Sequence, residues 1–147
     1  MTSILLLFSE DLICLVFLET NNNPGWVYVY HRHENNSWLM YQAIQSPLGN
    51  NSYFGAAVSV HENSIIVGAD GFPNAEITGA AFSYRRDSTT GPYLLESAYP
   101  SVAGVKGHFG WAADIVDTFV AVGAYGYGKI LHVIVEFFLT HSCFIFR

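Results

Sequence analysis

The sequence predicts an all-β protein built from repeated units. The first observation is that Tyr53–Asp70 returns as His108–Tyr125, 55 residues further along, with the same spacing between the shared letters. The second is that short β-branched and aromatic runs alternate with clusters of Asn, Gly, Pro and Ser, which are typical of turns. The third is that no stretch sustains the helical period. A period in the tens of residues indicates stacked supersecondary units.

Two dipeptides, a Phe-Gly and a Gly-Ala, hold each copy of the repeat in register. The predicted structural residues are these two dipeptides in both copies: Phe54, Gly55, Gly68, Ala69, Phe109, Gly110, Gly123 and Ala124. A large aromatic ring can plug between adjacent sheets, and a glycine keeps a strand end slim where sheets crowd together. We therefore expect these residues to control packing between units.

The repeat divides the chain into four predicted segments. Gly25–Arg32 lies 54 residues before Gly79–Arg86, so one whole unit is visible twice. A fainter copy opens the chain, because Phe8–Leu15 can be laid over Val60–Val67. The segments are a degenerate partial repeat, two full repeats and an atypical apolar tail, at residues 1–24, 25–78, 79–128 and 129–147.

The N-terminal part is expected to form two hairpins. The apolar runs Ile4–Phe8 and Leu12–Phe17 are predicted to be short buried strands on either side of the polar turn 9–11. After an Asn-rich loop, Trp26–His31 and Trp38–Ile44 are rich in aromatic and β-branched residues, which favour strands.

The next unit shows the same order of elements. Ala56–Val60 and Ser64–Gly68 flank a tight turn, and Ala80–Arg86 and Tyr93–Ser97 flank a turn with Gly and Pro. Each unit therefore contains four short strands. Four antiparallel strands in a unit of this length are the build of a propeller blade, while ankyrin, tetratricopeptide and HEAT repeats are helical and leucine-rich repeats are shorter. The predicted fold is a partial β-propeller of four-stranded antiparallel blades.

These residues resemble the FG-GAP repeat, which builds the seven-bladed propeller of integrin alpha subunits. The resemblance covers residues 25–128 and lies in the Phe-Gly and Gly-Ala dipeptides, followed by an aromatic strand that ends in Tyr84-Arg85-Arg86. The third letter of the second motif is often proline in that family, and here it is Asp70 and Tyr125. The resemblance implies a binding or adhesion module at or outside the cell surface.

The calcium loop of many integrin-type repeats is missing from this sequence. The matching positions are His61-Glu62-Asn63 and Asp114–Asp117. Calcium needs about six to eight oxygen ligands, which neither segment supplies. We therefore expect no metal site and no cofactor, as in the short-loop version of the repeat.

Composition narrows the class of partner. Apolar residues make up 51% of the chain and charged residues only 12%, so the chain is globular. The net charge is −6 and no basic cluster exceeds Arg85-Arg86, so nucleic acid is not an expected partner.

The two ends of the chain leave membrane association open. The N-terminal apolar run has no early basic residue and is broken by Glu10-Asp11, which makes it a poor signal peptide. The stretch Ile130–Phe146 contains His132, Glu136 and His141, and is short for a membrane span. These end segments are propeller strands, membrane segments or products of an imperfect gene model. Cys14 and Cys143 are interpreted as free thiols and do not decide the compartment.

No catalytic constellation stands out. His31 and His33 share one face of a strand, but no third metal ligand is near them in sequence. Five residues are candidates for a hydrolase triad, but no nucleophile elbow is present and their spacing follows the repeat: Ser59, His61, Asp70, His108 and Asp114. The Gly-rich run 123–128 lacks the Walker lysine. We predict that the chain is not an enzyme.

Aromatic residues on connecting loops are the predicted ligand contacts, namely Phe72, Tyr99, Tyr125 and Tyr127. Asn35 and Asn50 each stand two residues before a Ser and are candidate glycosylation acceptors. The predicted function is non-enzymatic recognition of a protein or glycan through loops that connect blades.

Two alternative functions stay open at this point. In the first alternative, the chain is the accessory propeller segment of a longer secreted hydrolase. In the second, it is a truncated product with no independent function. Because propellers need about four to eight blades, the remaining blades or other copies of the chain are expected partners.

Overall fold

The fold is taken from a computed structural model of the chain, which describes residues 2–9, 12–18, 24–48, 50, 52–71, 79–101, 107–117, 119–124, 132–137 and 142–146. For the strands at 2–9, 12–18, 132–137 and 142–146 only the backbone is described. All of the regular structure in these residues is β, which confirms the predicted class.

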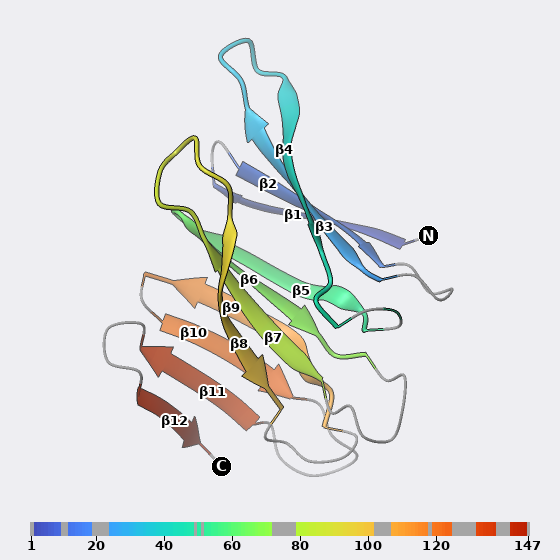
Figure 1. Cartoon of the computed structure of the whole chain (residues 1–147), viewed down its shortest axis with the longest axis vertical. Helices are drawn as coiled ribbons and strands as arrows, with labels where there is room; N and C mark the ends of the chain where they lie inside the picture. Colours follow the sequence, from blue (N-terminus) through green and yellow to red (C-terminus); the bar gives the residue numbers. More distant parts are fainter. Residues whose placement is uncertain are drawn as a thin grey trace.

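The strands form three four-stranded antiparallel sheets, each in simple chain order (Figure 1). Sheet A contains β1 (Thr2–Ser9), β2 (Leu12–Leu18), β3 (Trp26–Arg32) and β4 (Trp38–Gln45). Sheet B contains β5 (Phe54–His61), β6 (Ser64–Ala69), β7 (Ala80–Arg85) and β8 (Leu94–Pro100). Sheet C contains β9 (Phe109–Val116), β10 (Phe119–Ala124), β11 (His132–Phe137) and β12 (Ser142–Phe146).

The sheets start at a different point of the repeat from the predicted segments. The predicted boundaries at residues 25 and 79 run through sheets A and B, because β3 pairs with β2 and β7 pairs with β6. The apolar tail supplies β11 and β12, which join the same sheet as β9 and β10. Each sheet therefore takes its first hairpin from one predicted segment and its second hairpin from the next.

The first hairpin of every sheet has the same length of turn. Two residues separate β1 from β2, β5 from β6 and β9 from β10. In sheets B and C the first turn residue is Glu62 with φ 50° or Asp117 with φ 53°, both in the left-handed region. The faint sequence match of Phe8–Leu15 to Val60–Val67 therefore aligns the end of β1 with the end of β5, and the start of β2 with the start of β6.

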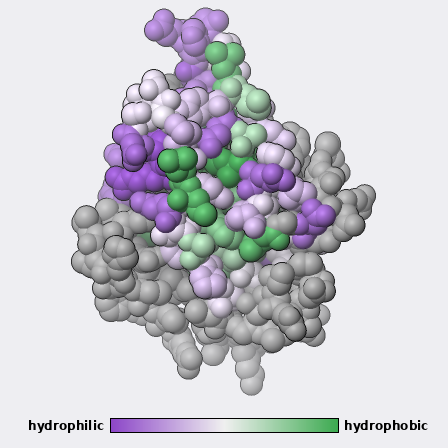
Figure 2. Space-filling model, in the orientation of Figure 1, coloured by the Kyte–Doolittle hydropathy of each residue, from purple (hydrophilic) through white to green (hydrophobic). Residues whose placement is uncertain are grey.

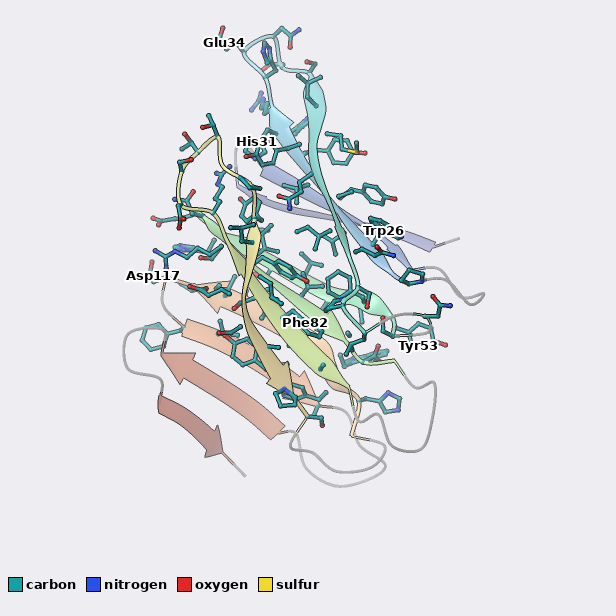
Figure 3. The ribbon with its side chains drawn as sticks, in the orientation of Figure 1. Trp26, His31, Glu34, Tyr53, Phe82 and Asp117 are labelled. Atoms are coloured by element: carbon teal, nitrogen blue, oxygen red, sulfur yellow. The ribbon has the colours of Figure 1, made fainter. Side chains whose placement is uncertain are left out.

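Sheet B lies between sheets A and C (Figure 1) and is buried on both faces. Successive residues of β6 point to opposite faces. Ile65 and Val67 pack with Val27 and Val29 of sheet A, while Ile66 packs with residues of sheet C. Phe82, which Figure 3 labels, belongs to the cluster between sheets A and B. This arrangement explains why β6 is a continuous apolar run.

A Phe-Gly segment of each following sheet meets a glycine of the preceding one. A Cβ on Gly25 would lie 2.2 Å from the carbonyl oxygen of Phe54, and a Cβ on Gly79 would lie 2.0 Å from that of Phe109. Both phenylalanines are fully buried. A Cβ on Gly68 would likewise lie 2.0 Å from the carbonyl oxygen of Gly110. Only glycine allows two backbones to approach this closely.

Replacing Gly79 with alanine is expected to destabilise the fold by roughly 3 kcal/mol or more. Its φ of 92° is unfavourable for a side chain, at a cost of about 1–3 kcal/mol. The clash with Phe109 adds overpacking of about 1–3 kcal/mol. Urea denaturation followed by circular dichroism measures the change. The matched control is Gly91→Ala, whose Cβ meets only the Ser88 hydroxyl at 2.9 Å, and which should shift stability by about 0.5 kcal/mol. Equal effects of the two substitutions would contradict a special role for Gly79.

Candidate binding surface

The outer strands of sheets A and B expose two pairs of large apolar side chains. Leu39 and Met40 of β4 are 55% and 60% exposed. Leu94 and Leu95 of β8, which stand 55 residues later, are 60% and 51% exposed. We call these four residues the rim surface. Figure 2 shows apolar groups over β4 and β8 among polar neighbours.

The two halves of the rim surface are held together by hydrogen bonds between the sheets. The Gln42 side-chain amide donates to the Tyr93 carbonyl at 2.9 Å and accepts from the Tyr93 N–H at 2.8 Å. The Tyr41 hydroxyl donates to the Gly91 carbonyl. These bonds fasten β4 of sheet A to the connection between β7 and β8 of sheet B. The rim surface is therefore built across two sheets rather than on one.

Arg86 and His31 form a second bridge next to the rim surface. Arg86 Nη1 lies 3.0 Å from His31 Nε2, and its guanidinium carbon lies 5.1 Å from the centre of the Tyr93 ring. Arg86 Nε donates to Asn63 Oδ1 at 2.9 Å. The His31 ring stacks on Tyr41 with 4.3 Å between ring centres. Since arginine can only donate, His31 accepts at Nε2 and its neutral form carries the proton on Nδ1.

Two open depressions lie beside the hairpin of β3 and β4. The smaller, about 270 Å³, is lined by His31, Arg32, His33, Leu39, Met40 and Tyr41. The larger, about 480 Å³, is lined by His31, Arg32, His33, Glu34 and Asn36. Figure 3 shows Glu34 at the tip of this hairpin, with His31 below it. The smaller depression combines cationic, aromatic and apolar walls, and it runs into the rim surface through Leu39 and Met40.

The five candidates for a triad, together with Asp117, form three separate pairs between sheets B and C. Ser59 Oγ donates to Asp114 Oδ1 at 2.7 Å. His61 Nε2 lies 3.6 Å from Asp117 Oδ1, and His108 Nδ1 lies 3.5 Å from Asp70 Oδ2. Each pair joins one side chain of β5, or of the residue that follows β6, to a side chain in β9 or next to it. Among the described residues, no three His, Cys, Asp or Glu side chains come together to hold a metal ion.

Of the four predicted ligand contacts, the structure describes only Tyr99. Tyr99 was expected on a loop, and this placement is wrong, because β8 continues to Pro100. The Tyr99 side chain is only 9% exposed and packs between sheets B and C, with its hydroxyl 3.3 Å from Ser83 Oγ. Because Tyr99 occupies an inward-facing strand position, its side chain packs in the core. Phe72, Tyr125 and Tyr127 lie outside the described residues.

The two glycosylation candidates differ in their serine. Asn35 is exposed, and its Oδ1 accepts from both the Ser37 N–H and the Ser37 hydroxyl. Asn50 is also exposed, but Ser52 is only 2% exposed and its hydroxyl lies 2.7 Å from Ser46 Oγ.

Sequence reasoning missed the rim surface, although one signal for it was present. Trp38-Leu39 recurs as Tyr93-Leu94, which marks equivalent strand positions in the repeat. The sequence pattern alone does not say that these strands stand at sheet edges and leave their apolar side chains uncovered.

Comparison with known proteins adds no name to this surface. No protein-family model matches the chain, and no curated protein matches it. In the part of the chain that the structure describes, no helix is long and apolar enough to cross a membrane.

Asp70→Asn is expected to stabilise the chain at neutral pH. Asp70 is 7% exposed, and burial raises its pKa above the ordinary 3.8, while contact with His108 acts in the opposite direction. Because the folded chain holds this proton to higher pH than the unfolded chain, wild type loses stability as pH rises from 3.8 through the raised pKa. The variant lacks this ionisation and escapes the loss.

Urea denaturation of both chains across acidic to neutral pH checks this expectation. The gap between their free energies of unfolding should open as the pH rises, with Asp70→Asn more stable at neutral pH. A variant that is less stable at neutral pH would mean that the His108 contact outweighs the burial of Asp70.

Proposed function

We propose that the chain is part of an FG-GAP-like β-propeller that acts as a non-enzymatic binding module at or outside the cell surface. The three antiparallel four-stranded sheets in chain order support this reading, because each has the composition expected of a blade. The equivalent contacts of Gly25 with Phe54 and of Gly79 with Phe109 support it further, since they repeat one junction along the chain.

The observation that carries the binding role is the rim surface. Large apolar side chains that are left exposed mark candidate interaction sites. Here Leu39, Met40, Leu94 and Leu95 recur at equivalent repeat positions. The hydrogen bonds of Tyr41 and Gln42 pre-organise them, which lowers the entropy cost of binding. Apolar anchors beside an aromatic and cationic layer suit a protein ligand better than a glycan.

Fixed partners for the titratable side chains support a scaffold rather than a reaction centre. Ser59, His61 and Asp70 each engage a residue of the neighbouring sheet. Their chemistry is used to hold sheets B and C together.

Met40→Glu and Leu95→Glu are each expected to weaken ligand binding by roughly tenfold or more, because a charge replaces an apolar anchor. The probe is an immobilised panel of extracellular-matrix proteins and glycans, followed by interferometry on whichever component binds. Leu48→Glu is the matched control, since Leu48 is 41% exposed but follows β4 at the opposite end. A panel without any binder, or an equal loss with Leu48→Glu, would contradict this function.

A further inference from the structure

The outer face of sheet C is equivalent to the face of sheet B that packs against sheet C. Val120 and Val122 are buried against sheet B, so the alternate residues Phe119 and Ala121 point to the opposite face. Ala121 is half-buried, whereas its counterpart Ile66, 55 residues earlier, is fully buried against sheet C. We call Val116, Phe119 and Ala121 the trailing face. Val116 and Phe119 are 52% and 45% exposed.

The outer face of sheet A is equivalent to the face of sheet B that packs against sheet A. Val27 and Val29 are buried toward sheet B, so Trp26, Tyr28 and Tyr30 point away from it. We call these three aromatic residues the leading face. The Trp26 and Tyr28 rings are stacked, with 6.2 Å between their centres, and all three residues are half-buried.

Inside the chain, faces of these two kinds pack against each other. The counterparts of Tyr28 and Tyr30 in sheet B are Phe82 and Tyr84, 54 residues later. Both are at most 5% exposed, in one cluster with Val27 and Val29 of sheet A. The same junction follows between sheets B and C, where Ile66 packs with Val120 and Val122. In the part of the chain that the structure describes, a leading face on sheet A and a trailing face on sheet C lie outside these two internal junctions.

We infer that the trailing face of sheet C binds the leading face of sheet A in a second copy of the chain. The contact continues the junction that the chain already uses between its own sheets, with the same order of faces. It is a heterologous, head-to-tail interface, which closes into a ring or grows according to the rotation between copies. The inference rests on the repeat architecture of the proposed function, but it does not depend on the ligand.

Sequence at the two faces indicates a looser junction than the internal ones. Phe54-Gly55, at the start of β5, corresponds to Thr2-Ser3 at the start of β1. Gly25 and Gly79 each directly precede the third strand of their sheet, where sheet C has Leu131. Both halves of the glycine contact are therefore missing together. Without that close approach, the assembly should be reversible.

Sedimentation velocity of the whole chain over a concentration series tests the interface. The wild-type mass should rise with concentration above the 16.3 kDa of one copy. Ala121→Arg blocks the trailing face and Tyr28→Arg blocks the leading face, so each variant should stay at 16.3 kDa. Circular dichroism verifies that both retain the wild-type β spectrum.

Mixing the two blocked variants is the decisive arm, because each keeps one intact face. A one-to-one mixture should give a species of twice 16.3 kDa that does not grow further. The matched control Leu48→Arg changes a side chain that is 41% exposed in the turn after β4, outside both faces and outside the rim surface, and should assemble like wild type.

Three outcomes would overturn the inference: wild type at 16.3 kDa throughout, a mixture that stays at 16.3 kDa, or loss of assembly in Leu48→Arg. Running Ala121→Arg over the matrix-protein and glycan panel separates the two proposals. A single-copy variant that still binds its ligand, or a wild type that assembles without binding any, shows which of them has failed.

Discussion

The structure depends on the close approach of one backbone to another at the Phe-Gly segments. Phe109 and Gly110 come close to sheet B because Gly79 has no side chain opposite Phe109 and Gly68 has none opposite Gly110. Excluding a Cβ lets the carbonyl groups of one sheet lie against the backbone of another, and the buried ring fills the gap beside them. Phe54 makes the equivalent contact with Gly25, and the centre of its ring lies 5.9 Å from the centre of the Phe82 ring. Stacking of the sheets follows from this contact.

Polar and titratable side chains serve the same stacking. Ser59 with Asp114 and His108 with Asp70 join sheets B and C, and Gln42 joins sheets A and B through the backbone of Tyr93. A buried polar group costs free energy unless it is paired, so such residues favour one alignment of the sheets over slipped alternatives. The chain has few charged residues, and in the function that we propose this use of them leaves recognition mainly to apolar and aromatic side chains.

Position in the stack changes what equivalent residues do. Ile66 is fully buried in sheet B, whereas Ala121 at the same repeat position of sheet C is only half-buried. The same relation holds between Phe82 and Tyr28 on the other side. A repeat protein buries an inner unit on both faces and an end unit on one face, because each unit contacts only its neighbours. The outer faces of sheets A and C and the edges of β4 and β8 are therefore the surfaces on which we propose that partners bind.

The sequence by itself determined the period, the all-β class and most strand positions, because alternation and turn residues act within a few residues. It also singled out the Phe-Gly and Gly-Ala dipeptides. Only the tertiary structure decided which strands share a sheet, and it placed Tyr99 in the core and Leu39 at an exposed edge. The physical reason is that alternation divides a strand into two faces without saying what covers each one. The covering residues stand about one repeat, 55 residues, away, and they meet only when the sheets stack.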